Sequence, residues 1–194
     1  KRKKISNILE ENIKRELAAL NMTKVDFKVD FQKKSQFTSE GNDKIEFLIS
    51  TNLGEELKPL SKIVSGGEMS RIMLAFKSIL AFFDQIPTMI FDEIDTGISG
   101  RTAQIVGEKI HNISRNHQVL CISHLPQIAA LADSHFVINK VVLEDKTNTV
   151  ISKLSDKDRI EEMARLLGGV DLTDTTLRHA SEMIDMSKKI KERA

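Results

Sequence analysis

One stretch decides the fold: residues 88–124 read TMIFDEIDTGISGRTAQIVGEKIHNISRNHQVLCISH. Apolar runs at 88–91 and 119–122 flank a helical pattern at 100–114, and both runs are too short to be helices themselves. A strand, a helix and a second strand in this order form a parallel pair joined by a crossover. The stretch therefore predicts an α/β protein with a mostly parallel sheet flanked by helices. It also places polar residues at the carboxyl ends of the strands, where such sheets bind ligands.

Periodic patterns extend in both directions from this stretch. A helical stripe ends near Asn21, and alternating strands at 25–31 and 45–49 flank a polar loop, which predicts a hairpin lying against the core. The stripe consists of Ile5, Ile8, Leu9, Ile13, Leu17 and Leu20. A second hairpin is expected at the sheet edge, with strands at 136–143 and 149–154 around a turn at 144–148. Further helices are expected at 67–83, from 126, at 157–167 and at 173–191.

Composition limits the class of protein. The 194 residues carry 29 Lys+Arg and 28 Asp+Glu, a net charge of +1, so any DNA contact must be a local patch. The single cysteine, Cys121, excludes an internal disulfide, fits a reducing cytoplasmic compartment and is expected to be a core thiol. No apolar run approaches the roughly 18 residues that span a bilayer, so we expect a soluble protein without a membrane partner. Because the chain begins at Lys1, we expect it to be an excised part whose preceding segment is absent.

Two glycines stand directly before a helical pattern, in Ser65-Gly66-Gly67-Glu68. The backbone at such a helix start approaches a ligand closely, and its unpaired amides and the helix dipole favour an anion such as phosphate. The alternative is a glycine turn in which Ser65 caps the helix. Arg71, one turn beyond Glu68, either pairs with it or positions the glycine segment.

Two carboxylates and a histidine follow the predicted strands. Asp92 would hold a hydrated Mg²⁺ and Glu93 would polarise a water as general base, or both are solvated charges at the start of a loop. His124 would hydrogen-bond a phosphate oxygen, or it caps and packs locally. Cys121 and His124 could form half of a zinc site, but no second cysteine exists and the other histidines lack a ligand spacing.

Together these segments resemble an ABC-type ATPase head, and most closely the RecN family of SMC-like proteins. Residues 65–68 resemble the signature motif, 88–93 the Walker B strand, 95–99 the D-loop and His124 the switch histidine. The resemblance is dense from residue 60 to about 140 and rests on LSKIVSGGEMSR, IFDEIDTGISG and SHLPQ. Transporter and general SMC heads usually carry Asp where Ser99 stands, and this departure favours RecN.

The resemblance implies an ABC-ATPase-type head lobe with antiparallel hairpin additions. Residues 1–21 would be the end of a returning coiled-coil helix, and 22–194 the C-terminal half of a head that is split in sequence. The implied cofactors are ATP and Mg²⁺, with Asp92 as the metal residue and Glu93 and His124 as catalytic residues. Nucleotide contacts are implied for the signature and D-loop residues Ser65, Gly66, Gly67, Glu68, Asp95 and Ser99.

The implied partners are DNA, a second head paired through ATP, and the N-terminal half of the same head. That half would supply the phosphate loop, since none of the nine glycines here is followed by Lys-Ser or Lys-Thr. This chain alone is therefore expected to be inactive. With ATP sandwiched between two heads, the helix start at Ser65 is expected to lie away from the catalytic carboxylates.

The implied function is ATP-driven head engagement in DNA double-strand-break repair, in the nucleoid-associated cytoplasm, with hydrolysis releasing the heads. One alternative is the head of another SMC-related ATPase in chromosome maintenance. The other is a non-catalytic module for dimerisation or DNA interaction, which the presence of Glu93 disfavours.

Overall fold

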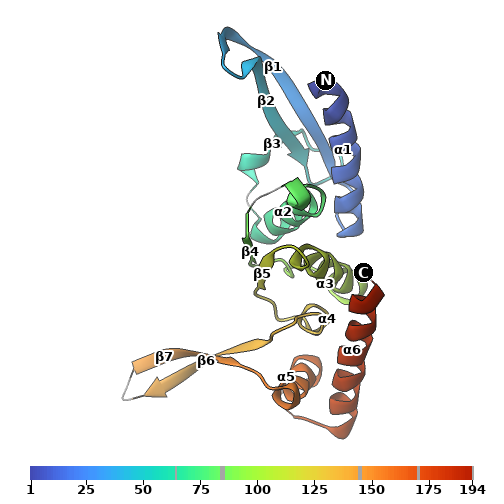
Figure 1. The fold of residues 1–194 in the computed structure, drawn as a ribbon, viewed down its shortest axis with the longest axis vertical. Helices are drawn as coiled ribbons and strands as arrows, with labels where there is room; N and C mark the ends of the chain where they lie inside the picture. The colour runs from blue at the N-terminus through green and yellow to red at the C-terminus, as the bar shows by residue number, and fades with distance from the viewer. Residues whose placement is uncertain (64, 84–85, 144–145, 170, 194) are drawn as a thin grey trace. The chain divides into compact units, whose positions relative to one another are not determined.

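The computed structural model describes residues 1–63, 65–83, 86–143, 146–169 and 171–193 (Figure 1). Val64 of the stretch LSKIVSGGEMSR and residues 144–145 of the predicted hairpin turn lie outside this part. The chain divides into two compact units, Lys1–Ile98 with Ile113–Ile122, and Ser99–Asn112 with Ser123–Ala194. No helix of the described residues is both long and apolar enough to cross a membrane.

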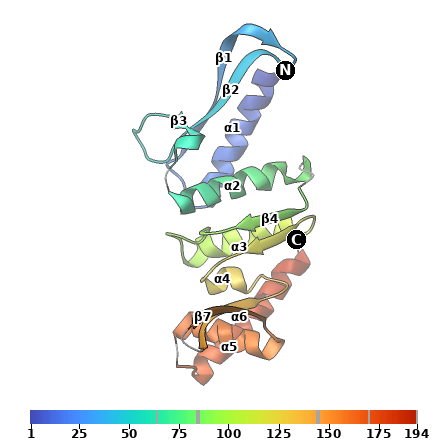
Figure 2. The same cartoon turned by 90° about the vertical axis from the view of Figure 1, so that its left-hand side faces the viewer.

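The first unit begins with a helix beside a hairpin. Helix α1 (Arg2–Ala19) packs against strand β1 (Asp26–Thr38), as Figure 2 shows. Ile13, Leu17 and Leu20 of the predicted stripe are fully buried, whereas Ile5 and Ile8 are 64% and 60% exposed. The C-terminal part of the stripe therefore faces the core of this unit, and its first turns do not.

The first hairpin is longer than the sequence predicted. Strands β1 and β2 (Gly41–Ser50) pair antiparallel through most of the expected polar loop, and β3 (Lys58–Pro59) joins the far edge of β2. Lys33 Nζ and Asp43 Oδ1, on register partners, lie 2.9 Å apart, so polar pairs replace apolar ones in this part of the ladder. Gly41 begins β2 at φ +97°, a conformation that favours glycine.

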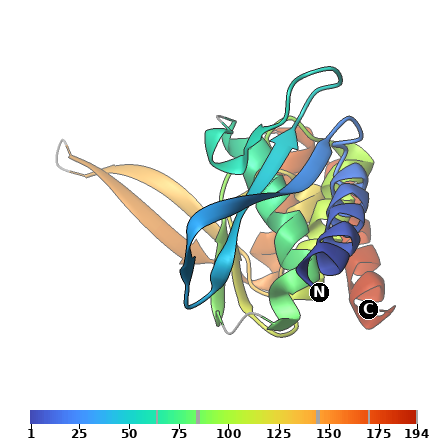
Figure 3. The same cartoon turned by 90° about the horizontal axis from the view of Figure 1, so that it is seen from above.

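Helix α2 (Gly66–Leu80) completes the core of the first unit. It follows a 3₁₀ turn, η1 (Leu60–Lys62), and continues into a second one, η2 (Ala81–Phe83). The ring of Phe76 lies 5.5 Å from the ring centroids of both Phe27 and Phe47, where the hairpin crosses α2 (Figure 3). The predicted hairpin against the core is thus confirmed, with aromatic rings at the contact.

Strands β4 (Thr88–Phe91) and β5 (Gln118–Cys121) form the predicted parallel pair. Met89 and Phe91 face the core, whereas Ile90, Leu120 and Ile122 are 68%, 47% and 52% exposed. Continuous apolar runs of this kind are typical of strands buried on both faces. In the structure one face of the pair is covered and the other is open.

The second unit is mainly helical. Its core comprises Ala130, Met163, Ala164, Ala180 and Ile184, all of them buried. Among the described residues, the helices of this unit are α3 (Gly100–Ser114), α4 (Pro126–Ala129), α5 (Asp156–Gly168) and α6 (Asp174–Arg193). The last residues of α3 belong to the first unit. These bounds lie within a few residues of the predicted ones.

The second hairpin stands apart from the helices of its unit. Strands β6 (Phe136–Leu143) and β7 (Lys146–Lys153) pair only with each other among the described strands, and they project away from α5 and α6 (Figures 1 and 3). Every residue of β7 is exposed. The structure therefore differs from the prediction of a hairpin at the edge of the parallel sheet.

The α/β class is confirmed, with helices and both kinds of sheet. The described strands form one parallel pair and two antiparallel sheets. The parallel part is thus smaller than the mostly parallel sheet expected, because a single crossover through α3 connects only β4 and β5.

Candidate functional site

The start of α2 has the geometry of a capped helix. Ser65 has φ −84° and ψ 119°, and its Oγ accepts a hydrogen bond from the amide of Glu68 at 3.5 Å. Its carbonyl accepts the first helical hydrogen bond, from Met69, at 3.0 Å. The capping alternative for Ser65 is therefore realised, and capping leaves the helix start oriented to receive an anion.

The two glycines lie against the loop that follows β4. A Cβ on Gly66 would collide with Oε2 of Glu93. A Cβ on Gly67 would lie 2.8 Å from the Cβ of Thr96 and 3.2 Å from the carbonyl oxygen of Glu93. Gly67 is thus required for the close approach between α2 and this loop, whereas a Cβ on Gly66 would require only the side chain of Glu93 to move.

The carboxylates occupy the carboxyl end of β4, as predicted. Asp92 and Glu93 are both exposed, and Asp92 Oδ1 accepts a hydrogen bond from the Glu93 amide at 2.9 Å. Glu93 has φ +54°, which is uncommon for a residue other than glycine and costs about 1 kcal/mol or more. The amide of Thr96 donates to the Glu93 carbonyl at 3.2 Å and closes a turn.

One expectation about the site is wrong. The glycine helix start was expected to lie away from the carboxylates, yet Gly66 is in contact with the carboxylate of Glu93. The reason is local: after β4 the chain turns back immediately at Glu93, and the first two turns of α2 hold that turn by hydrogen bonds.

Two side chains of α2 make those hydrogen bonds. Ser70 Oγ donates to the carbonyl of Asp92 at 2.7 Å, and Arg71 Nη1 donates to the carbonyl of Thr96 at 2.5 Å. Arg71 is 9% exposed, and its burial lowers its pKa, while the charge of Glu68 opposes that shift. This hydrogen bond goes to the loop after β4, a contact that neither role considered from the sequence, pairing with Glu68 or positioning the glycine segment, anticipated.

Asp95 belongs to the carboxylate loop, the residues after β4 that begin with Asp92 and Glu93, and Cys121 is the last residue of β5. Asp95 is 5% exposed, so its side chain is turned into the protein instead of toward a ligand in solvent. Burial, with smaller contributions from Asp95 and Asp92, raises the pKa of the Cys121 thiol from 9.0 to about 12. The thiol is half-buried and protonated at neutral pH, which agrees with the prediction of a core thiol.

Ser99 and His124 belong to the second unit. Ser99 is exposed just before α3, and His124 is exposed just before α4. Ser123 Oγ accepts a hydrogen bond from the Leu125 amide at 3.1 Å, which shapes the turn into α4. The structure thus brings Gly66, Gly67 and Glu93 together within the first unit.

The sequence of the chain is similar to that of known proteins. No family model matches the chain. It is 47% identical over 194 residues to DNA repair protein RecN of Halalkalibacterium halodurans, covering 98% of this chain and 34% of that protein. The chain is a segment of a RecN-type protein. It is also 44% identical over 205 residues to DNA repair protein RecN of Bacillus subtilis, covering 98% of this chain and 36% of that protein. This RecN-type segment spans about a third of the length of the curated relatives it matches.

Solved SMC heads share the fold of this RecN-type segment. An Smc head domain with an extended coiled coil from Pyrococcus furiosus, bound to the C-terminal domain of ScpA, matches with a TM-score of 0.51, covering 80% of this chain and 37% of that one at 22% identity. An Smc head with a coiled coil and joint from Pyrococcus yayanosii also has a TM-score of 0.51, covering 92% of this chain and 29% of that one at 21% identity. The SMC-like head fold is therefore confirmed.

The donor set of the RecN-type segment fits magnesium better than zinc. Among the described residues, no group of three or more His, Cys, Asp or Glu side chains could hold a metal ion. Mg²⁺ needs less from the protein, since it keeps several waters and binds one or two carboxylates together with substrate phosphates. The exposed Asp92 can serve as such a carboxylate.

Sequence reasoning missed how α4 is held. Arg159 Nη2 of α5 donates to the carbonyls of Ala129, Ala130 and Ala132 at 3.2, 2.8 and 2.8 Å. Ser187 Oγ of α6 donates to the Ala130 carbonyl at 2.7 Å. Every residue type has a main-chain carbonyl, so the sequence of α4 does not indicate that these contacts form.

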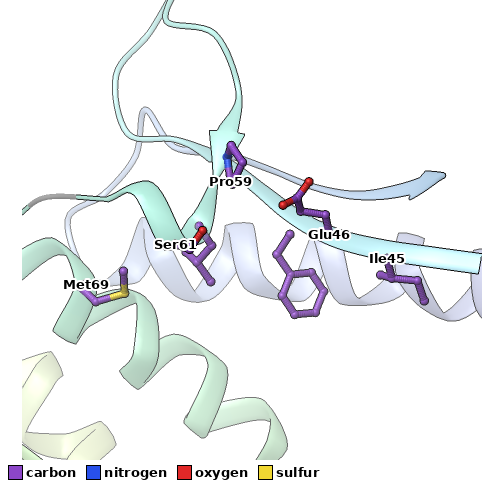
Figure 4. A pocket seen from close by; sticks show the side chains of 7 residues that line it. Ile45, Glu46, Pro59, Ser61 and Met69 are labelled. Atoms are coloured by element: carbon purple, nitrogen blue, oxygen red, sulfur yellow. The ribbon is translucent and has the colours of Figure 1, made fainter.

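An open depression of about 440 Å³ lies on the first unit (Figure 4). Met69 of α2 and Ile45 of β2 line it, along with Glu46, Phe47, Pro59, Leu60 and Ser61. None of the predicted site residues is among them. The depression is a separate feature from the carboxylate loop.

Proposed function

We propose that this chain forms part of the ATPase head of a RecN-type DNA repair protein, namely the C-terminal half that carries the signature, Walker B and D-loop segments. One observation carries the proposal: Asp92 and Glu93 emerge at the carboxyl end of a parallel strand, beside a glycine helix start. The names of the relatives support the choice of DNA repair over other uses of the fold.

Each residue would have a distinct role in ATP hydrolysis. Asp92 would hold Mg²⁺, which supplies charge stabilisation to the transferring phosphoryl group when bound. Glu93 would accept a proton from the attacking water, and its exposed carboxylate has access to solvent. His124 would contact the γ-phosphate, while Ser65, Gly66 and Gly67 would bind the phosphate of ATP held by a second head.

The remaining half of the site would come from outside this chain. No G-x-x-x-x-G-K-[ST] segment occurs in the sequence, so the cradle for the β-phosphate must be supplied elsewhere. The open face of the parallel pair, with Ile90, Leu120 and Ile122, supports this, since an apolar sheet face is stable when another layer covers it. We propose that the N-terminal half of the same head covers it, with residues 1–21 leading in from a coiled coil.

ATP would then act as the ligand that pairs two heads, and hydrolysis would separate them. Such a cycle can open or close an assembly on DNA, which we propose as the partner in the nucleoid-associated cytoplasm. Glu68, Asp95 and Ser99 would lie at the paired surface. For Asp95 to contact nucleotide, its buried side chain must turn outward on pairing, since it is 5% exposed here.

Two substitutions in the full-length protein test the proposal. Glu93→Gln should lower ATP turnover at least about 100-fold while leaving ATP binding intact, because the amide cannot accept the proton. Glu161→Gln, on the exposed surface of α5, is the matched control and should leave turnover unchanged. Ser65→Arg should retain ATP binding by one head but prevent ATP-dependent pairing in light scattering. Full turnover in Glu93→Gln, or unchanged pairing in Ser65→Arg, would refute the assignment.

A further inference from the structure

The first two turns of α2 are fastened to the main chain on both sides of Glu93. Ser70 Oγ binds the carbonyl of Asp92 at 2.7 Å, and Arg71 Nη1 binds the carbonyl of Thr96 at 2.5 Å. Because both acceptors are main-chain groups, these contacts fix the path of the backbone on either side of Glu93.

Burying the charged side chain of Arg71 between α2 and the loop after β4 costs desolvation free energy. Its guanidinium stays charged although the residue is only 9% exposed, and its buried Nε has no hydrogen-bond partner among the described residues. Burying an ion against a single carbonyl is often no better for stability than an apolar side chain of similar volume. A methionine could fill the volume, but it could not bind the Thr96 carbonyl, so the contact itself is the feature that Arg71 provides.

The segment between the two anchors is under local strain and in tight contact with the helix start. Glu93 has φ +54°, its carboxylate touches Gly66, and its carbonyl lies against Gly67. A displacement of the start of α2 should therefore displace the Glu93 backbone as well, because the two are joined by the close contacts of Gly66 and Gly67 and by the two hydrogen bonds.

We propose that Ser70 and Arg71 are positioning residues that couple the phosphate-binding start of α2 to Glu93, so that phosphate from a second head sets the position of the general base. This inference rests on the proposed function of Glu93 and of the helix start. It adds that the signal passes through two side chains that themselves touch no nucleotide. Hydrolysis in one head would then depend on whether that head has engaged its partner.

The test uses the full-length protein and separates kcat from KM. Arg71→Met should lower kcat about tenfold or more, since a displacement of about 1 Å costs up to ~100-fold, with the KM for ATP and ATP-dependent pairing within about twofold of the unsubstituted protein. Arg71→Lys keeps a charged donor and should recover a substantial part of kcat. Arg178→Met, on exposed α6, is the matched control and should change none of these values.

Ser70→Ala provides a second, milder variant in case Arg71→Met does not fold. It removes only a hydroxyl and should lower kcat about threefold or more, with KM and pairing unchanged. A kcat within about twofold of the unsubstituted protein in folded Arg71→Met or in Ser70→Ala would overturn the inference. So would a joint loss of folding, binding and kcat that Arg71→Lys does not relieve. If Glu93→Gln abolishes turnover while Arg71→Met does not, the inference fails alone. If Glu93→Gln retains turnover, the proposed function fails and the inference with it.

Discussion

The loops that follow β4 and β5 are held in different ways. After β4, the hydrogen bonds from Ser70 and Arg71 reach the very segment that carries Glu93. After β5, the comparable hydrogen bonds from Arg159 and Ser187 reach carbonyls from Ala129 to Ala132, at and just after the end of α4 and beyond His124. The position of Glu93 therefore depends on the helix that begins with the two glycines, whereas the segment after His124 depends on the C-terminal helices. Substitutions in the two regions should accordingly have separable effects.

The largest effect is expected in the second unit. Arg159→Met removes a charged donor from three carbonyls at the end of α4, and we expect it to lower the free energy of unfolding by about 3 kcal/mol. The melting temperature of the chain should fall by about 6–12 °C. Arg165→Met, which removes an ion pair between the exposed Arg165 and the partly buried Glu162 on the same helix, is the control and should change stability by less than about 1 kcal/mol. Equal shifts for the two variants would show that α4 is not held by Arg159.

The two glycines of the first unit should differ from each other. A Cβ at residue 67 meets the Cβ of Thr96 and a main-chain carbonyl, which cannot yield easily. Gly67→Ala should therefore lower the free energy of unfolding by about 1–3 kcal/mol, the usual range for overpacking.

Gly66→Ala is the matched comparison. Its Cβ meets only the end of the Glu93 side chain, which can rotate away, so the loss should stay below about 1 kcal/mol. Thermal melting of the two variants measures the difference. If Gly66→Ala destabilised the chain more than Gly67→Ala, the contact between α2 and the loop would be misassigned.

At neutral pH the smallest effect is expected from Cys121, whose thiol contributes a pH dependence of stability only from about pH 9 upward. Burial raises the pKa of its thiol from 9.0 to about 12, so the unfolded chain loses this proton at lower pH than the folded one. Stability from the protonated thiol is fully present below pH 9 and decreases as pH rises toward 12, by up to about 1.4 kcal/mol per pH unit. Denaturant unfolding at pH 8 to 10 should show a steeper loss in the unsubstituted chain than in Cys121→Ala. Parallel pH profiles would contradict the buried, protonated thiol.

Much of the fold could be predicted because its determinants are local. The short apolar run at 88–91 and the helical spacing in 100–114 predicted β4 and α3 at their observed bounds. The extension of β1 and β2 was missed because its ladder uses pairs such as Lys33 and Asp43, which look like loop residues in a sequence. The separate position of β6 and β7 was missed because alternating apolar residues do not reveal which sheet a strand joins.

The site was predictable in its residues but less so in its contacts. Asp92 and Glu93 were correctly placed at the end of β4, since strand ends in parallel sheets are ligand sites. The contact between Gly66 and Glu93 was not predicted, because it depends on a turn in which a glutamate adopts a positive φ. Hydrogen bonds to main-chain carbonyls, such as that of Arg71 to Thr96, leave no partner residue type to recognise.

The central claim is that this chain carries half of a composite ATPase site. The most direct measurement is steady-state ATP turnover by the chain alone, by the chain assembled with the N-terminal part of its own protein, and by that assembly with Glu93→Gln. We predict negligible turnover by the chain alone, turnover on assembly, and its loss in the variant, because the phosphate loop and the general base lie on different parts. Robust turnover by the purified chain alone, or turnover by the assembly that survives Glu93→Gln, would contradict the account.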